Sequence, residues 1–118
     1  MAIFSVNKEK IVFSDTIVSQ EDTQIITIEN LTASPINVSL TIFSPFYLFF
    51  NPIKKNSAII TISGNSSKSV VLLFKPTKQE EFSTDLLITA ETETINIEVS
   101  GKGIIKNEYL YDKIENNL

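Results

Sequence analysis

Short segments in which apolar and polar residues alternate recur along this chain, and this pattern limits the possible folds more than any other feature. Ile36–Phe43 is the cleanest example, with aliphatic side chains at every second position and asparagine, serine and threonine between them. Successive side chains of a β-strand point to opposite faces, so this period is typical of a half-buried strand. Thr23–Glu29 and Thr94–Ser100 alternate in the same way. These segments predict antiparallel strands with one face in a core.

A second kind of segment is apolar throughout. Lys68–Thr77 holds two valines, two leucines and a phenylalanine in succession, and Pro76 follows them. Such a run between turn-forming residues predicts a strand buried on at least one face, and proline ends it because it lacks a backbone N–H. Ile3–Val6 and Lys10–Ser14 are two short apolar pieces that could form one bent first strand pairing with both sheets in turn. Further strands are predicted at Phe46–Phe50, Ser57–Ile62 and Ser83–Thr89.

The predicted strands recur at roughly ten-residue spacing with turn-forming residues between them, which favours an antiparallel β-sandwich. No segment before residue 104 shows sustained helical periodicity. The sequence therefore predicts one all-β, immunoglobulin-like sandwich of about seven to eight strands over residues 1–103, closed by Gly101-Lys102-Gly103. At 118 residues the chain is long enough to form a core without metal or disulfide support.

Residues 104–118 are predicted to form a C-terminal arm. Leu110, Ile114 and Leu118 lie four residues apart, and Ile105 and Tyr109 share that spacing. This spacing permits an amphipathic helix of about three turns. A frayed terminus is the alternative.

The composition excludes several kinds of active site. The chain has no cysteine and no histidine, which removes thiolate ligands, the most frequent general base and the most frequent metal ligand. No phosphate-binding glycine loop or nucleophile elbow is present. The acidic pairs Glu80/Glu81 and Glu91/Glu93 fall in predicted turns, where solvated charge is the simplest interpretation. We therefore expect a protein that is not an enzyme and that carries no metal or cofactor.

Charge and hydropathy limit the partners. The formal net charge is -4, and all positive charge comes from lysine, so nucleic acid is not an expected partner. The first residues lack a basic segment followed by an apolar one, and no apolar run is long enough to span a bilayer. We expect a protein that stays in the cytoplasm or is built into a virion assembled there.

The order of the turn-forming residues resembles the Hydin-type ASH domain family, whose members are immunoglobulin-like sandwiches related to the major sperm protein domain. The resemblance covers about residues 8 to 103. It rests on Ile26-Thr27-Ile28-Glu29-Asn30, Pro35-Ile36-Asn37-Val38, Ser44-Pro45-Phe46, Gly64-Asn65-Ser66-Ser67 leading into Val70–Phe74-Lys75-Pro76-Thr77, and Val99-Ser100-Gly101-Lys102-Gly103. The chain departs from the family at Gln79-Glu80-Glu81, where such domains usually have glycine, so the turn there is expected to differ.

The resemblance implies a non-catalytic scaffolding or protein-docking module. The most concrete version is a virion accessory protein that decorates a phage capsid or tail, because an acidic, cysteine-free sandwich is similar in architecture to such proteins. One alternative is a cytoplasmic scaffold domain that binds a peptide or protein. Another is a carbohydrate- or small-ligand-binding module, although the chain has no tryptophan to stack on a sugar ring.

Two segments are candidates for a protein interface. Within Phe46–Phe50, alternation places Phe46, Leu48 and Phe50 on the core side and directs Tyr47 and Phe49 away from it. Two exposed aromatic residues would suit a partner or self-association. The alternative is that loops or the arm cover all five residues.

The arm is the second candidate, through Tyr109, Leu110, Tyr111 and Ile114, which could pack on a neighbouring subunit or add a strand to a free sheet edge. Packing against its own domain is the alternative. Lys54-Lys55 could attract an acidic peptide, or could simply be solvated loop charge.

Overall fold

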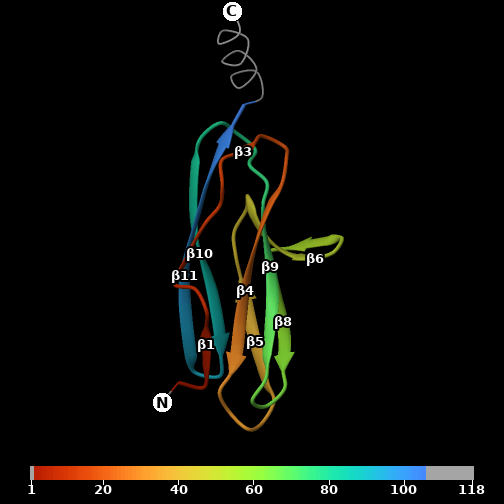
Figure 1. Cartoon of the computed structure of the whole chain (residues 1–118), viewed down its shortest axis with the longest axis vertical. Helices are drawn as coiled ribbons and strands as arrows, with labels where there is room; N and C mark the ends of the chain where they lie inside the picture. The colour runs from red at the N-terminus through yellow and green to blue at the C-terminus, as the bar shows by residue number, and fades with distance from the viewer. Residues whose placement is uncertain (1, 106–118) are drawn as a thin grey trace, which may run out of the picture.

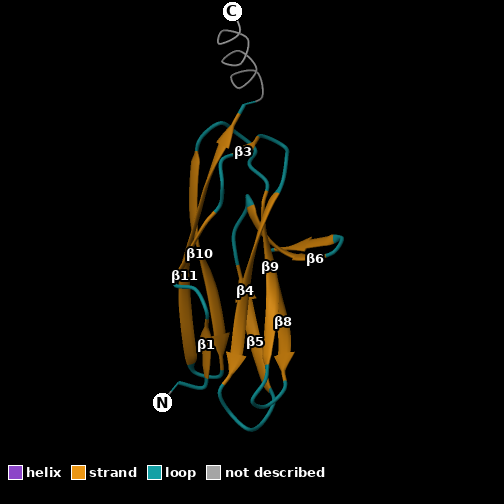
Figure 2. Ribbon diagram, in the orientation of Figure 1, coloured by secondary structure: helices purple, strands orange, loops and turns teal. Residues whose placement is uncertain are grey.

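The computed structural model describes residues 2–105, which form eleven strands in two packed sheets (Figures 1 and 2). The five-stranded sheet has the spatial order β1 (Phe4–Val6), β4 (Asp22–Asn30), β9 (Ser67–Phe74), β6 (Phe46–Phe50) and β7 (Ile53–Lys55). The six-stranded sheet has the order β2 (Lys10–Val12), β11 (Glu93–Ile104), β10 (Glu81–Ala90), β5 (Ile36–Thr41) and β8 (Ser57–Ile62), with β3 (Thr16–Ile17) also paired to β11. The predicted all-β sandwich is confirmed.

The alternating segments lie where the sequence predicts them, with their apolar sides in one shared core. Every second residue of β5 is buried, and the residues between are exposed or partly exposed. β4 and β11 follow the same rule over the parts that cross the core. Because burial of apolar area is the dominant favourable term in folding, this periodic match explains why the chain forms two facing sheets.

Four phenylalanine rings join the two sheets at one end of the core. Phe46 and Phe74 stack with ring centroids 4.8 Å apart, and Phe13 contacts both at 5.8 and 5.5 Å. Phe82, on β10, meets Phe74 edge-on at 6.0 Å. These rings come from both sheets and from the segment after β2, so the cluster fixes the sheets relative to each other.

The glycines near the end of β11 lie within the strand and do not end it. A Cβ on Gly101 would lie 2.6 Å from the Phe74 ring, and one on Gly103 would lie 2.2 Å from the carbonyl oxygen of Lys78. Both positions are buried and both belong to β11, which continues to Ile104. At both positions glycine permits a close approach within the strand and does not form a turn.

Two short strands were not predicted. β7 has three exposed residues, and β3 has only two, so neither carries a burial pattern. β2 and β3 both pair with β11 in parallel, an exception to the otherwise antiparallel pairing. The strand count therefore exceeds the predicted seven to eight. The division of the chain at residue 104 stays a prediction, because residues 106–118 lie outside the described part.

The turn between β10 and β11 offers a test of local strain. Its first residue, Glu91, has a φ of 55°, a left-handed conformation that favours glycine. We expect Glu91→Gly to raise the free energy of unfolding by about 0.5–1 kcal/mol, as measured by urea denaturation.

Thr92 is the matched control, because it is the other residue of the same turn and its φ is not positive. We expect Thr92→Gly to lower the free energy of unfolding by a similar amount, since glycine only adds freedom to the unfolded chain there. Equal effects of the two substitutions would contradict the assignment of strain to Glu91.

Candidate protein-interaction surface

The aromatic strand β6 divides its side chains between two faces, as alternation predicts. Phe46 and Leu48 are fully buried in the core, whereas Tyr47 and Phe49 are half-buried on the opposite face. Phe50 shares the core side of the strand but is 37% exposed. The alternative in which loops bury all five residues is wrong, and so is the placement of Phe50 in the core. Cover by the arm lies outside the described residues.

Tyr47 and Phe49 join an apolar surface that crosses three strands on the outer face of the five-stranded sheet. In the ladder, Phe49 of β6 lies opposite Val71 of β9, and Val71 lies opposite Ile25 of β4. Tyr47 lies opposite Leu73 in the next row on that face. Residues paired this way have neighbouring side chains on one face of a sheet. We call Ile25, Tyr47, Phe49 and Val71 the outer patch.

Leu73 shows how closely the side chains of this face pack. It is only 1% exposed, yet it is not part of the core cluster, and its neighbours Leu72 and Phe74 point into the core. Alternation therefore directs Leu73 outward, and side chains of the outer face must cover it. Ile25, by contrast, is 53% exposed. The outer patch therefore covers the buried side chain of Leu73 and also exposes apolar surface, mainly at Ile25.

One ion pair lies among the residues near the outer patch. Lys54, opposite Phe49 on β7, contacts the carboxylate of Glu21 with an N–O distance of 2.7 Å. Both side chains are about one-third exposed, so the pair adds little stability but places polar groups beside the apolar area. Lys54 is therefore partly neutralised, which weakens the interpretation of Lys54-Lys55 as a site for an acidic peptide.

The β6–β7 hairpin projects sideways from the sandwich (Figure 1). Near its tip, Phe50 and Ile53 lie opposite each other and are exposed. They share a face of the hairpin with Leu48, but the hairpin has left the space between the sheets at this point. The projection explains why Phe50 is exposed although alternation assigns it to the core side.

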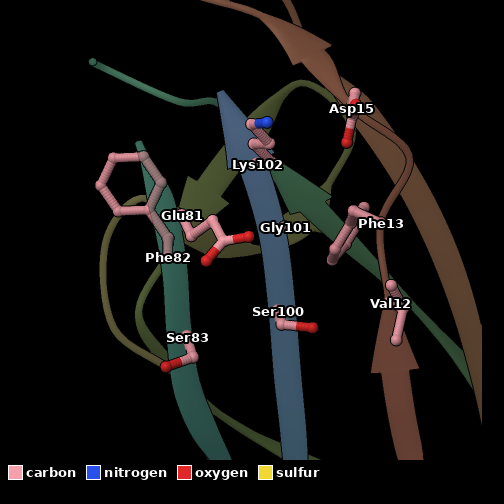
Figure 3. A pocket seen from close by; sticks show the side chains of 9 residues that line it. All are labelled: Val12, Phe13, Asp15, Glu81, Phe82, Ser83, Ser100, Gly101 and Lys102. Atoms are coloured by element: carbon pink, nitrogen blue, oxygen red, sulfur yellow. The ribbon is translucent and has the colours of Figure 1, made fainter. Parts of the chain in front are cut away.

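A hollow of about 580 Å³ is lined by the start of β10, the end part of β11 and the segment from the end of β2 to Asp15 (Figure 3). Its charged lining groups are Asp15, Glu81 and Lys102, and these come from three separate segments. Glu81 and Lys102 are opposite each other in the β10–β11 ladder. The lining of the hollow contains no histidine or cysteine.

Glu93, one of the acidic residues considered in the sequence, has a structural role. The carboxylate of Glu93 accepts a hydrogen bond of 2.7 Å from the backbone N–H of Ile3, which ties the N-terminal segment to β11. Within residues 2–105, no group of three acidic side chains is placed to hold a metal ion. Over the same residues, no helix has the length and apolar character needed to cross a membrane.

The sequence identified half of the outer patch. Ile25 and Val71 were not proposed as interface residues, although Val71 belongs to a run that is apolar at every position. A strand that is apolar on both faces is expected to have contacts on both. That signal could have identified Val71, whereas only the register places Ile25 beside it. The predicted interface residues Tyr109, Leu110, Tyr111 and Ile114 lie outside the described residues.

Comparison with solved structures supports the fold assignment. The chain is similar to the ASH / PapD-like domain of human CEP192 (PapD-like domain 7), with a TM-score of 0.70, 12% identity, and coverage of 87% of this chain and 86% of that one. It is also similar to WR4, a C. elegans member of the MSP family, with a TM-score of 0.56, 8% identity, and coverage of 86% and 99%. Neither a protein-family model nor a curated protein matches the sequence.

A family 123 glycoside hydrolase from Clostridium perfringens is similar as well, with a TM-score of 0.61 and 15% identity. The match covers 86% of this chain but only 27% of the hydrolase. At these identities the likeness concerns the fold alone. The fold is an ASH/MSP-like, immunoglobulin-type β-sandwich, as the sequence resemblance predicts.

Proposed function

We propose that this protein is a non-enzymatic docking domain that binds a protein partner through the outer patch. The observation that carries the proposal is a row of apolar side chains that crosses three strands on the outer face of the five-stranded sheet, in contrast to the outward residues of β5. On β5 of the six-stranded sheet, the outward residues are Asn37, Ser39 and Thr41, which suit water. On the five-stranded sheet, the outward row is isoleucine, valine and phenylalanine.

The chemistry of the outer patch fits a protein partner. Aromatic residues are enriched at the centres of protein interfaces, where truncation of a central residue costs about 2–4 kcal/mol of binding free energy. Tyr47 supplies an aromatic ring with a hydroxyl, and Phe49 supplies a ring without one. The nearby Lys54–Glu21 pair supplies polar groups of the kind that surround such a centre. The docking role that the ASH resemblance implies is consistent with this arrangement.

The test is affinity capture from extracts of the source cells with the wild type and with the double variant Tyr47→Ser/Phe49→Ser. We expect the double variant to retain the main captured protein at least about tenfold less well, because it removes both aromatic rings from the interface centre. Circular dichroism melting checks that the variant is still folded.

Two further variants separate binding from folding. Ile25→Lys adds a charge to the outer patch at a residue that is 53% exposed, so it is expected to lose the partner without unfolding. Phe43→Ser removes an aromatic residue that is 55% exposed and outside the outer patch, so it is expected to keep the partner. Equal capture by the wild type and by folded Ile25→Lys would refute the proposal.

The identity of the captured protein decides between the versions of this role. A capsid or tail subunit would support the virion accessory protein, which is the version we propose first. A cellular protein would support the cytoplasmic scaffold. The expected cytoplasmic location stays a prediction.

A further inference from the structure

The strand β8 leaves one side of the six-stranded sheet unpaired. It pairs with β5 over its whole length, and no other described strand pairs with it. β8 has six residues, whereas the strands at the other ends of the two sheets, β1, β7 and β2, have three residues each. Long free edges are the positions at which sheets add further strands.

The direction of each backbone group in β8 follows from two observed hydrogen bonds. The N–H of Ile42 donates to the carbonyl of Asn56 at 2.9 Å, which continues the β5–β8 ladder, so the backbone groups of Asn56 face β5. The carbonyl of Thr61 instead accepts a bond of 2.9 Å from the Lys68 side chain. Backbone direction alternates along a strand, so the groups of Ser57, Ile59 and Thr61 face away from β5.

The composition of β8 does not protect this edge. Natural edges are usually protected by charged residues, proline or bulges. β8 has the sequence Ser-Ala-Ile-Ile-Thr-Ile, which contains no charge and no proline. Ile59 is 72% exposed at its centre. Ala58 and Ile60 point inward, yet they are only partly buried, because no further strand covers the core at this edge.

Among residues 2–105, the side chain of Lys68 covers part of this edge. Lys68 lies on β9 of the other sheet, and its side-chain amine donates a hydrogen bond to the carbonyl oxygen of Thr61. Lysine at an edge is a recognised obstacle to strand addition. It is held here by one hydrogen bond between exposed groups, so it can be displaced at small cost.

We propose that two copies of this chain associate through β8, with the strands antiparallel about a two-fold axis at Ile59. Ile59 would lie opposite Ile59 of the second copy, and Ser57 opposite Thr61. All three residues face the free edge, so each opposed pair can exchange two backbone hydrogen bonds. The two sheets would then form one continuous sheet across the axis.

A second copy fits this edge because β8 is complementary to itself. The axis passes between the two copies of Ile59, a residue whose N–H and C=O both face the free edge, as an isologous pairing requires. The two Ile59 side chains would cover each other, and Ser57 would place its hydroxyl beside that of Thr61. Ala58 of one copy would lie opposite Ile60 of the other, which covers the inward side chains that the single chain leaves partly open. The strand is uncharged, so its two copies do not repel each other along the contact.

The contact is small, so the association is expected to be weak. One strand pair buries less than the roughly 1,200 Å² of total surface found in stable specific interfaces. We expect a monomer in dilute solution and a dimer at the concentrations used for NMR, with a dissociation constant of about 0.1–1 mM.

The first measurement is amide hydrogen exchange of the full chain by NMR at low and high protein concentration. The amides of Ser57, Ile59 and Thr61 are expected to become protected as concentration rises. Those of Ala58 and Ile60 already bond to β5 and should change much less. This alternation along one strand distinguishes strand pairing from contact through a side-chain patch.

Three variants test the same contact by sedimentation equilibrium. Ile59→Lys places a charge on the axis, where the two copies would repel, so we expect dimerisation to weaken by at least about tenfold. Lys68→Ala removes the side chain that blocks Thr61, so dimerisation should strengthen severalfold. Ile25→Lys is the matched control, because it changes an exposed isoleucine of a strand to the same residue on the other sheet.

The proposal is overturned if the wild type stays monomeric up to about 1 mM. It is also overturned if Ile59→Lys self-associates as the wild type does, or if Ile25→Lys abolishes the association, which would assign it to the outer patch. Ile59→Lys should keep the captured partner of the proposed docking function, so the two proposals can fail independently.

Discussion

Phe74→Ala is expected to remove about 3–5 kcal/mol from the free energy of unfolding. The ring of Phe74 is fully buried, stacks on Phe46 at 4.8 Å and contacts the rings of Phe13 and Phe82. Its loss leaves a cavity at the point where the two sheets meet, and the surrounding backbone belongs to strands that cannot easily collapse into it. Urea denaturation measures the effect. The total free energy of unfolding of a native domain is about 5–15 kcal/mol, so the variant should be only marginally stable.

Two comparisons make this prediction specific. Phe43→Ala removes the same ring from a position that is 55% exposed, and should change the stability by at most about 0.5 kcal/mol. Gly101→Ala should destabilise the wild type, because the new Cβ would lie 2.6 Å from the Phe74 ring. In the Phe74→Ala background that ring is absent, so the same change should be much less harmful. Additive effects in this double-mutant cycle would contradict the role assigned to the ring.

The sequence predicts those parts of the fold that are determined by burial. β4, β5 and β11 are identified by alternation because one face of each is in the core. β7 was missed because its residues are all exposed, and β3 because two residues cannot show a period. These strands form because neighbouring strands supply hydrogen bonds. Backbone pairing of this kind does not require any pattern of apolar and polar residues in the strand itself.

The sequence predicts which residues of β6 belong to the candidate surface, but not which residues of the neighbouring strands complete it. Alternation assigned Tyr47 and Phe49 to the outward side of β6 correctly, since this depends only on the strand itself. It could not show that Val71 and Ile25 complete the row, because that depends on the register with β9 and β4. It also placed Phe50 in the core, because alternation gives the side of a strand and not whether another sheet lies opposite.

The glycines of β11 show that glycine in a sequence does not always indicate the end of a strand. Gly101 and Gly103 follow an alternating strand, which favours the interpretation of a strand end. The reason for glycine at these positions is the close approach of Phe74 and of the Lys78 carbonyl. Both contacts join residues far apart in the chain, so local sequence does not reveal them.

Asn30 is the polar residue on which the turns at one end of the sandwich depend, and Asn30→Asp is expected to remove about 3–5 kcal/mol of stability. Asn30 is 1% exposed. Its side-chain amide donates to the carbonyls of Ser34, Ile62 and Ser63 at 2.8, 3.0 and 3.1 Å. Its oxygen accepts from the backbone N–H and the hydroxyl of Thr32.

These bonds connect the turn after β4 to the end of β8 and the turn after it, so one side chain holds together two loops that each cross from one sheet to the other. Aspartate has nearly the same shape as asparagine, but its carboxylate cannot donate. The substitution would therefore place a buried negative charge against three carbonyl oxygens. Asn30→Ala removes the bonds without adding the charge and should cost less, about 2–3 kcal/mol.

Asn37→Asp is the matched control for Asn30→Asp, because it makes the same change at an exposed position of β5. There the side-chain oxygen accepts a bond of 2.7 Å from the hydroxyl of Thr61, and a carboxylate would accept that bond as well. We expect the control to change the stability by at most about 0.5 kcal/mol in urea denaturation. If Asn30→Asp were no worse than Asn30→Ala, the three donated bonds would not be what joins the loops. The asparagine that ends β4, and on which part of the ASH resemblance rests, would then need a different physical explanation.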